Sequence, residues 1–184
     1  MASYSNNRQF DLAVPDCSEV IKREPENSSG YNCRGVAYEG LKHHDRAIAD
    51  YDQSININPK NGVAYWNRGN AHMALRKIDK VDDAIADYDQ AIAINPKDFN
   101  AFNSRGKAWV AKGDRSSANA DVNAIADFTQ AIGLNPSYVE AYNNRGLTYE
   151  TVGRRAEALA DFRKAQSIDP DDPVSRKLLR LLGF

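Results

Sequence analysis

The side chains best suited to catalysis or metal binding in this sequence are its three histidines. His43 and His44 are followed directly by Asp45, a run of the side-chain types that bind zinc, and His72 stands apart from them. Adjacent histidines of this kind usually lie in water on an exposed turn, and no nucleophile, base and orienting group come together elsewhere. We therefore expect that the chain is not an enzyme and that it holds neither a metal nor a cofactor.

The two cysteines, Cys17 and Cys33, stand in neither a CxxC motif nor a mixed Cys and His motif. Such spacing indicates neither a zinc site nor a disulfide framework. We expect two free, buried thiols, although an oxidising compartment would reopen the question of a bridge.

The charges of the chain are balanced, because its 184 residues include 24 basic and 25 acidic side chains. A protein that binds nucleic acid by neutralising many phosphates normally has a basic excess. No run approaches the roughly 20 apolar residues of a transmembrane helix, and residues 1–9 lack the apolar core of a secretory signal. We expect no nucleic-acid partner and no membrane span. The compartment stays open: a cytoplasmic location is favoured, and a periplasmic one applies if a leader was removed.

Four segments of the chain share one pattern. Each begins with an aromatic residue followed three residues later by Arg-Gly, continues with an Ala-Ile-Ala-Asp or Ala-Leu-Ala-Asp block and an aromatic residue, and closes on proline. Within each segment apolar side chains recur at helical spacing, which predicts amphipathic helices and no strands. The four glycines are Gly35, Gly69, Gly106 and Gly146, and the four prolines are Pro59, Pro96, Pro136 and Pro170.

This pattern, with its 34-residue spacing, resembles the tetratricopeptide repeat family. The resemblance implies an all-α fold, a right-handed superhelical solenoid of antiparallel helix pairs, with a concave face lined mainly by the first helix of each pair. We expect a partial repeat at residues 1–27, four repeats at 28–61, 62–98, 99–138 and 139–172, and a capping helix at 173–184.

Each repeat carries its own helix signals. The recurrent glycine lies in the middle of a helix, where it costs about 1 kcal/mol relative to alanine, so we expect the paired helix to approach closely there. The Asn-Pro or Asp-Pro pair that closes each repeat is expected to end its second helix. Residues 13–25 align with residues 47–59, so residues 10–24 are expected to form an unpaired second helix that begins or kinks at Pro15.

The pattern departs from the family in having Arg before the glycine, where the family usually has Leu. An Asp recurs in every second helix, so we expect an Arg and Asp pair within each repeat, which fixes register more than it stabilises. The alternative is an anion site on the arginines. The residues concerned are Arg34, Arg68, Arg105 and Arg145, with Asp50, Asp87, Asp127 and Asp161.

Repeats two and three are longer than the others by three and six residues. The additions fall between the two helices, roughly at residues 75–83 and 113–123. Extension of the helices would keep the apolar stripe in register better than a bulge would. Whether the additions mark a binding face or are neutral extensions stays open.

The C-terminal segment, residues 173–184, holds four leucines with three basic residues and ends on Phe184. We expect it to cover the second helix of the fourth repeat. Apolar surface beyond what this contact buries would favour docking or self-association.

In the resembling family, set positions of the first helices line the concave groove. Here the lining is rich in asparagine, whose amide both donates and accepts and so suits the backbone of an extended peptide. Trp66 would add an aromatic anchor. The asparagines would equally serve to cross-link neighbouring helices, and both interpretations stay open. The expected binding residues are Asn32, Trp66, Asn67, Asn70, Met73, Asn103, Lys107, Asn143 and Asn144, beside Val36, Val110, Leu147 and Glu150.

The resemblance thus implies a non-enzymatic scaffold that binds a peptide or helix of another protein on its concave face. Some members hold the C-terminal carboxylate of chaperones in a clamp, but Asn32 and Val36 stand where that clamp has Lys and Asn. We therefore do not expect that ligand. The alternative function is self-assembly, through an open N-terminal face and the leucine-rich C-terminal helix.

Overall fold

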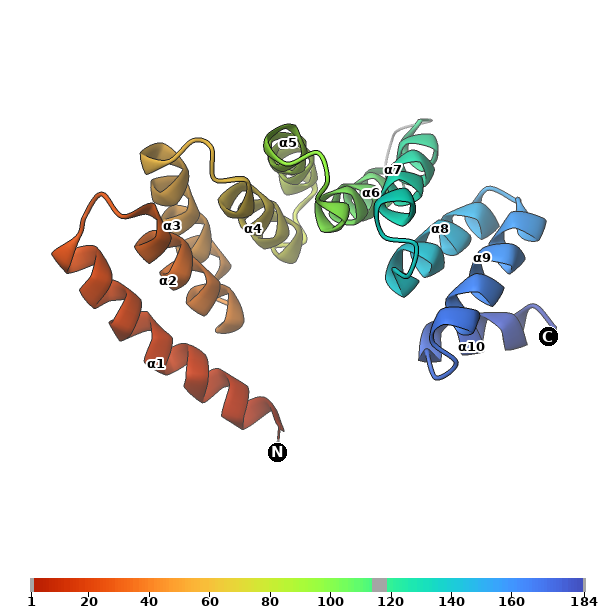
Figure 1. Cartoon of the computed structure of the whole chain (residues 1–184), viewed down its shortest axis with the longest axis horizontal. Coiled ribbons are helices and arrows are strands. Elements are labelled where there is room, and N and C mark those ends of the chain that lie inside the picture. The colour runs from red at the N-terminus through yellow and green to blue at the C-terminus, as the bar shows by residue number, and fades with distance from the viewer. Residues whose placement is uncertain (1, 114–118, 184) are drawn as a thin grey trace. The chain divides into compact units, whose positions relative to one another are not determined.

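The fold is all-α, as the sequence predicts. The computed structural model describes residues 2–113 and 119–183, with the backbone alone described for 2–7 and 78, and within these residues it has ten α-helices and no strand (Figure 1). Phe184, expected at the end of the capping helix, and residues 114–118 of the longer insertion lie outside this description. The helices are α1 (Ala2–Arg23), α2 (Ser28–Gly40), α3 (His44–Ile57), α4 (Gly62–Ala74), α5 (Ile78–Ile94), α6 (Phe99–Gly113), α7 (Ala120–Leu134), α8 (Val139–Thr151), α9 (Arg155–Ile168) and α10 (Pro173–Leu181).

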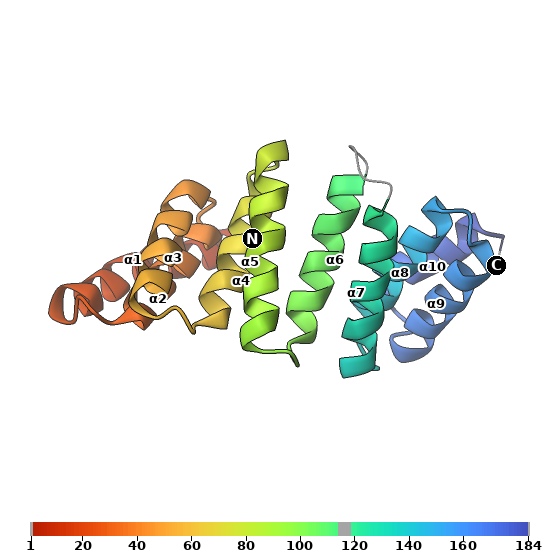
Figure 2. The ribbon, with the colours of Figure 1, turned by 90° about the horizontal axis from the view of Figure 1, so that it is seen from above.

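The chain divides into two compact units, residues 1–96 and 97–184. In the first unit α2 pairs with α3 and α4 with α5, while α1 packs on α2. In the second unit α6 pairs with α7 and α8 with α9, while α10 packs on α9 (Figure 2). The core of each unit is a row of small residues and single aromatic rings between successive helices, such as Ala47 with Tyr51 and Ala158 with Phe162.

Proline ends the second helix of each pair. α3 stops at Ile57, and the next residue, Asn58, leaves helical geometry with a ψ of 88° immediately before Pro59. The same junction closes α5, α7 and α9, with caps at Asn95, Asn135 and Asp169. Because proline disfavours the helical conformation of the residue before it, the sequence signal and the structure agree, and the prediction is confirmed.

The glycine in the middle of each first helix lies against an aromatic ring of the paired helix. A Cβ atom at Gly69 would come within 2.7 Å of Tyr88 Cε1, and one at Gly146 within 2.6 Å of Phe162 Cε1. The rings themselves are almost fully buried. The expected close approach is therefore confirmed, and it explains why a residue unfavourable to helices recurs there.

The N-terminal helix is longer than predicted. We expected a helix over residues 10–24 that begins or kinks at Pro15; α1 instead begins at Ala2 and continues through Pro15 as one helix (Figure 1). Pro15 is exposed, so the backbone position that lacks an N–H faces water rather than the neighbouring helix. Packing on α2 supports the helix on both sides of the proline, since Phe10 lies against Gly40 and Ile21 against Gly30.

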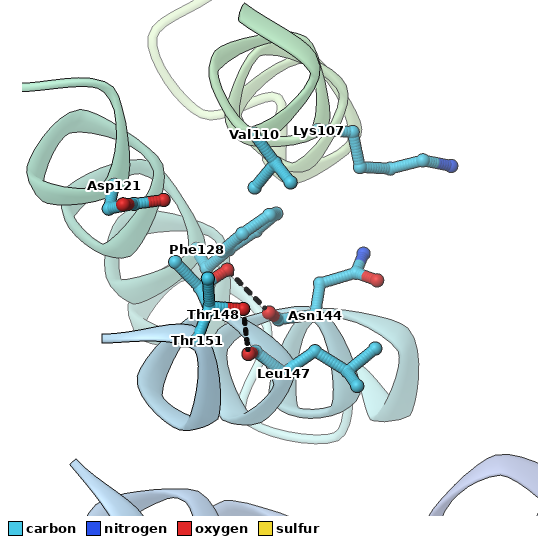
Figure 3. Close-up of a pocket in the computed structure, with 8 residues that line it drawn as sticks. All are labelled: Lys107, Val110, Asp121, Phe128, Asn144, Leu147, Thr148 and Thr151. Carbon is cyan, nitrogen blue, oxygen red and sulfur yellow. Dashed lines mark hydrogen bonds between the residues drawn. The ribbon is translucent and has the colours of Figure 1, made fainter. Parts of the chain in front are cut away.

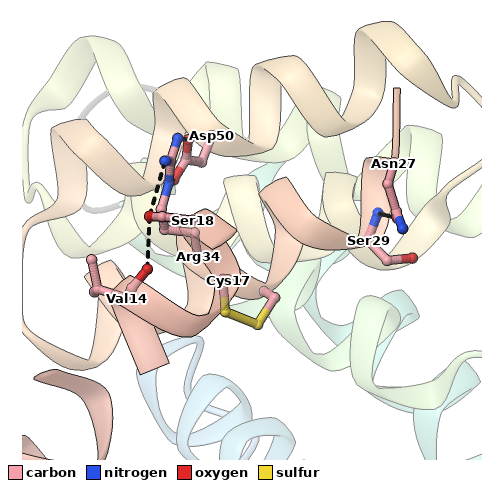
Figure 4. The surroundings of a disulfide bond; sticks show 8 residues. Val14, Cys17, Ser18, Asn27, Ser29, Arg34 and Asp50 are labelled. Carbon is pink, nitrogen blue, oxygen red and sulfur yellow. Dashed lines mark hydrogen bonds and ion pairs between the residues drawn. A yellow bond between two sulfur atoms is a disulfide. The ribbon is translucent and has the colours of Figure 1, made fainter. Parts of the chain in front are cut away.

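The expectation of two free thiols is wrong, because Cys17 and Cys33 form a disulfide between α1 and α2. Cys17 occupies the position of the repeat's aromatic residue and is buried, whereas Cys33 is exposed. A separation of 16 residues carries no disulfide signal of its own. The antiparallel packing of the two helices brings the cysteines opposite each other, with their Cα atoms 5.9 Å apart (Figure 4).

The additions in the longer repeats extend helices. α5 has 17 residues where α3 has 14, so the three extra residues of the second repeat lengthen its second helix, as expected. In the third repeat α6 and α7 have 15 residues each, and the rest of the addition falls on residues 114–118.

The C-terminal helix covers α9. α10 starts after Asp172, whose carboxylate accepts a hydrogen bond from the Ser175 N–H at 2.7 Å, an N-cap that favours the helix start. Leu179 is buried against Phe162, with Leu178 and Leu182 beside it. The expected capping contact is confirmed, but it leaves Leu181 71% exposed.

Candidate functional site

The expected Arg and Asp pairs form in all four repeats. In the first, Arg34 donates from Nε and Nη2 to the two oxygens of Asp50 at 2.8 and 2.7 Å, and each of the other three pairs has the same fork geometry. The aspartates are buried, so each charge is matched where water is largely excluded. In the fourth repeat the hydrogen bond to Asp161 raises the pKa of Arg145.

The arginines also reach the preceding helix pair, which the sequence did not predict. Arg34 Nη1 donates to Ser18 Oγ at 3.3 Å, as Figure 4 shows, and Arg145 Nη1 donates to Thr129 Oγ1 at 2.9 Å. Because both the fork and the remaining nitrogen of these guanidinium groups are engaged within the protein, the structure favours the structural pair over an anion site.

The asparagines of the first unit cross-link its first helices. Asn67 on α4 donates from Nδ2 to Asn32 Oδ1 on α2 at 3.1 Å. Asn70, one turn further along α4, accepts a hydrogen bond from the buried Tyr88 hydroxyl at 2.8 Å. Trp66 and Met73 lie half-buried on the same helix.

The second unit repeats this cross-link. Asn144 on α8 donates from Nδ2 to Asn103 Oδ1 on α6 at 3.0 Å, and Asn103 donates to the Tyr138 hydroxyl at 3.2 Å. Asn143 turns the other way and donates to Asp172, the N-cap of α10, at 2.9 Å. The cross-linking interpretation thus has direct contacts in both units. Asn103 and Asn143 are also buried, which leaves little of either for a ligand.

Beside this cross-link, the second unit has a cleft between α6 and α8, with α7 forming its floor. The cleft encloses about 150 Å³. Figure 3 shows Val110 on α6 and Leu147 on α8 on either side of the Phe128 ring. The lining residues are Lys107, Val110, Asp121, Phe128, Asn144, Leu147, Thr148 and Thr151.

The walls of this cleft are mainly apolar because its hydroxyl groups bond to their own helix. Thr148 Oγ1 donates to the Asn144 carbonyl at 2.9 Å, and Thr151 Oγ1 to the Leu147 carbonyl at 3.0 Å. A ligand in the cleft would therefore contact apolar side-chain atoms, and it would not need to form hydrogen bonds with these hydroxyl groups. Leu147 itself is 41% exposed, which leaves apolar surface open to an occupant.

One rim of the cleft carries a charged and hydrogen-bonded group. Lys107 Nζ lies 3.1 Å from Glu140 Oε1, and both side chains are about half exposed. Burial acts to raise the pKa of Glu140, but its hydrogen bonds, first that from Lys107, outweigh burial and lower it. Burial raises the pKa of the adjacent Tyr138 to about 12, so its hydroxyl stays protonated. An exposed pair of this kind is worth little to stability and can exchange partners readily.

The histidines occupy structural or surface positions. His72 is buried at the position that Tyr38 and Tyr149 hold in other repeats, with Nε2 3.7 Å from Asp87 Oδ2. Burial lowers its pKa. His44 Nδ1 lies 3.0 Å from Glu39 Oε1 in the turn of the first repeat. In residues 2–113 and 119–183, no group of three or more potential metal-ligating side chains is assembled.

The structure therefore gathers part of the expected binding set. Lys107 and Asn144 line the cleft together with Val110 and Leu147, while Asn32 and Asn67 meet in the other unit. Sequence reasoning missed Thr148 and Thr151, although each follows an expected groove residue by one helical turn. It had no signal for Asp121, which stands in the lengthened part of its repeat.

The chain resembles known repeat proteins in both sequence and structure. A family model described as "Tetratricopeptide repeat" matches residues 28–61 and 139–172, and one described as "TPR repeat" matches residues 74–113 and 122–153. No curated protein matches the chain in sequence.

Among solved structures, MamA is 27% identical with a TM-score of 0.76, over 88% of this chain and 89% of that one. The first TPR of Spaghetti (RPAP3), solved bound to the HSP90 peptide SRMEEVD, is 25% identical with a TM-score of 0.62, over 68% and 93%. YrrB, a TPR protein with an unusual peptide-binding site, shares the fold with a TM-score of 0.73 at 19% identity, over 96% and 86%. In the part of the chain that the structure describes, no helix is long and apolar enough to cross a membrane.

Proposed function

Because the chain belongs to the tetratricopeptide repeat family, we propose that it is a non-enzymatic scaffold that binds a segment of another protein on the first-helix face of its repeats. In the second unit the binding site is the cleft between α6 and α8. The occupant is an extended peptide or a helix that inserts one apolar side chain between Val110 and Leu147.

The observation that carries this proposal is the cleft itself. Its volume of about 150 Å³ equals that of an engineered apolar cavity that takes up benzene, so it suits one leucine or phenylalanine side chain. Burial of such a side chain between the apolar walls contributes roughly 25 cal/mol of binding free energy for each Å² of apolar surface removed from water. The Lys107 and Glu140 pair at the rim can contact the backbone or a polar neighbour of the anchor.

In the first unit the proposed face includes the bonded pair Asn32 and Asn67, with Trp66 as aromatic anchor. One oxygen and one N–H of this amide pair are committed to each other, so a peptide would use the remaining amide groups. Support for peptide binding as such comes from the solved relatives, of which one holds a chaperone peptide.

The experiment begins with a random peptide library selected on the wild-type chain. Selected peptides are expected to share one large apolar residue, and their affinity should fall for Val110→Asp, which puts a charge in the cleft wall. For the first unit, the affinity of the selected peptides is measured with the Trp66→Ala variant. Asn70→Ala is less suitable, because Asn70 holds the Tyr88 hydroxyl and its loss would disturb packing. Unchanged affinity in both variants would sink the assignment of the binding face.

A second candidate function, self-association, is supported by exposed apolar side chains on the terminal helices. Leu12 on α1 is 62% exposed, and Leu181 on α10 is 71% exposed. Light scattering over a concentration series tests it, since a chain that stays at the mass of one copy throughout excludes this candidate.

A further inference from the structure

The cleft between α6 and α8 has a different polar group at each end of its apolar middle. On its α8 wall, Asn144 and Thr151 lie two helical turns apart, with Leu147 between them. On its α7 floor, Asp121 precedes the Phe128 ring by two turns, which is about 10 Å along the helix axis. A ligand that covers the ring therefore has Asp121 at one of its ends only.

The charge at the other end, that of Lys107, is already balanced. Lys107 Nζ lies 3.1 Å from Glu140 Oε1, and the Tyr138 hydroxyl donates to Glu140 Oε2 at 3.5 Å. In Figure 3 the Lys107 amine points away from the Phe128 ring. A charged ligand group gains little from this exposed and already paired lysine.

The charge at the Asp121 end is not balanced within the part of the chain that the structure describes. Asp121 is half-buried, and no hydrogen bond or ion pair to a described residue engages its carboxylate. Figure 3 shows this carboxylate pointing from α7 toward Val110 and Phe128. The carbonyl ends of α6, at Gly113, and of α8, at Thr151, also lie at this end, and together they outnumber the one N-terminus of α7. Their partial charges favour a cation there.

We propose that the segment bound in this cleft carries a lysine or an arginine beside its apolar anchor, and that this cation pairs with Asp121. This inference rests on the proposed function of the cleft and names the chemistry of its ligand. A basic side chain fits because its aliphatic stem extends along the apolar wall while its charged head reaches the carboxylate. An acidic residue at the same place would face a like charge.

The separation between Asp121 and the Phe128 ring sets the spacing of the two ligand residues. In an extended segment, side chains two positions apart point to the same side and lie about 7 Å apart, and the stem of the basic residue spans the remainder. In a helix, residues three or four positions apart share one face. Bound segments should therefore have the basic residue two positions from the anchor if extended, and three or four if helical.

Asp121 also stands in the first turn of α7, where a carboxylate favours the start of a helix. This structural role affects the stability of the fold, but it gives no preference between a basic and an acidic peptide. The test must therefore measure that preference.

The test uses a peptide selected from a random library on the full wild-type chain, and a second peptide in which its basic residue is replaced by glutamate. Dissociation constants of both are measured by fluorescence anisotropy. Asp121→Asn should weaken the basic peptide about fivefold, and Asp121→Lys should reverse the preference between the two peptides. Added salt should reduce the preference of the wild type.

Two further variants complete the experiment. Asp171→Asn removes a carboxylate that is 97% exposed and does not line the cleft, so it should leave both affinities unchanged. Leu147→Ala shortens the cleft wall without a change of charge, so it tests the proposed function by itself. Circular dichroism verifies that each variant is folded.

The outcomes separate this proposal from the proposed function. If Leu147→Ala weakens binding but Asp121→Lys keeps the wild-type preference, the pairing with Asp121 is wrong and the cleft remains the binding site. Selected peptides without a basic residue at the stated spacings would have the same meaning. If Leu147→Ala leaves the affinity unchanged, the cleft is not the binding site and both proposals fail.

Discussion

Gly106 on α6 lies so close to the Phe128 ring on α7 that a Cβ atom at this glycine would come within 2.6 Å of Cε1. The ring is fully buried. Gly106→Ala should therefore destabilise the second unit by up to about 2 kcal/mol, since overpacking costs about 1–3 kcal/mol against a helix-propensity gain of about 1 kcal/mol. Urea unfolding followed by circular dichroism measures the change.

Gly133 on α7 is the matched control for this substitution, because a Cβ there has no neighbour within 4 Å. Gly133→Ala should stabilise by roughly 0.5 kcal/mol through helix propensity alone. Equal effects of the two substitutions would show that close packing is not the reason for the recurrent glycine.

The Arg145 and Asp161 pair gives a second prediction. Arg145→Leu should cost about 3 kcal/mol, because it leaves the buried Asp161 carboxylate without its cation. Adding Asp161→Leu should recover most of that loss, since an apolar pair replaces an ion pair at little net cost. Thermal or urea unfolding of the single and double variants measures their free energies of unfolding. A double variant no more stable than the single variant would contradict the prediction.

The pH dependence of stability follows from His72. Burial lowers the pKa of His72 in the folded state below its unfolded value of about 6.5, so the unfolded chain binds the proton more readily. The contribution of His72 to stability is therefore full at neutral pH and declines as pH falls below about 6.5.

His72→Tyr should flatten this part of the profile, because tyrosine occupies the same position in two other repeats and the substitution removes the imidazole. The free energies of unfolding at pH 7.5 and pH 5.5 check the prediction. The control is His43→Tyr, which makes the same change at a histidine on the surface. A wild type and a His72→Tyr variant with parallel profiles would show that His72 does not titrate differently on folding.

The disulfide between α1 and α2 supplies a fourth prediction. Closing a loop with a sequence separation of 16 residues should stabilise the first unit by roughly 3 kcal/mol through the entropy of the unfolded chain. Reduction with dithiothreitol should therefore speed hydrogen exchange in α1 and lower the midpoint of unfolding. The Cys17→Ser, Cys33→Ser double variant should already behave as the reduced chain and should not respond to the reagent.

How far the sequence predicts this molecule depends on the range of the interaction. The helix ends at Asn58 and its counterparts, the glycine contacts and the Arg and Asp pairs all recur with the repeat, so period and spacing reveal them. The disulfide does not recur, because only the contact between α1 and α2 places two cysteines opposite each other. The start of α1 before Pro15 likewise depends on tertiary packing, which overrides the local signal of proline.

The candidate site was predicted in part for the same reason. Lys107, Asn144 and Leu147, which the sequence assigns to groove positions of the first helices, line one cleft. Spacing in the sequence does not give the orientation of side chains. It therefore does not show which asparagines form cross-links or which surface stays open to a ligand. Asn143 shows this, because its amide turns toward Asp172 rather than the cleft.

The central claim, that the cleft between α6 and α8 binds an apolar anchor, is tested most directly by the dissociation constant of a library-selected peptide for two arginine variants. Leu147→Arg places a charge in the cleft, whereas Leu134→Arg makes the same change at a leucine of nearly equal exposure at the end of α7, 39% against 41%. We predict a loss of affinity of at least tenfold, about 1.4 kcal/mol, for Leu147→Arg and none for Leu134→Arg. Equal affinity of both variants for the peptide would contradict the claim.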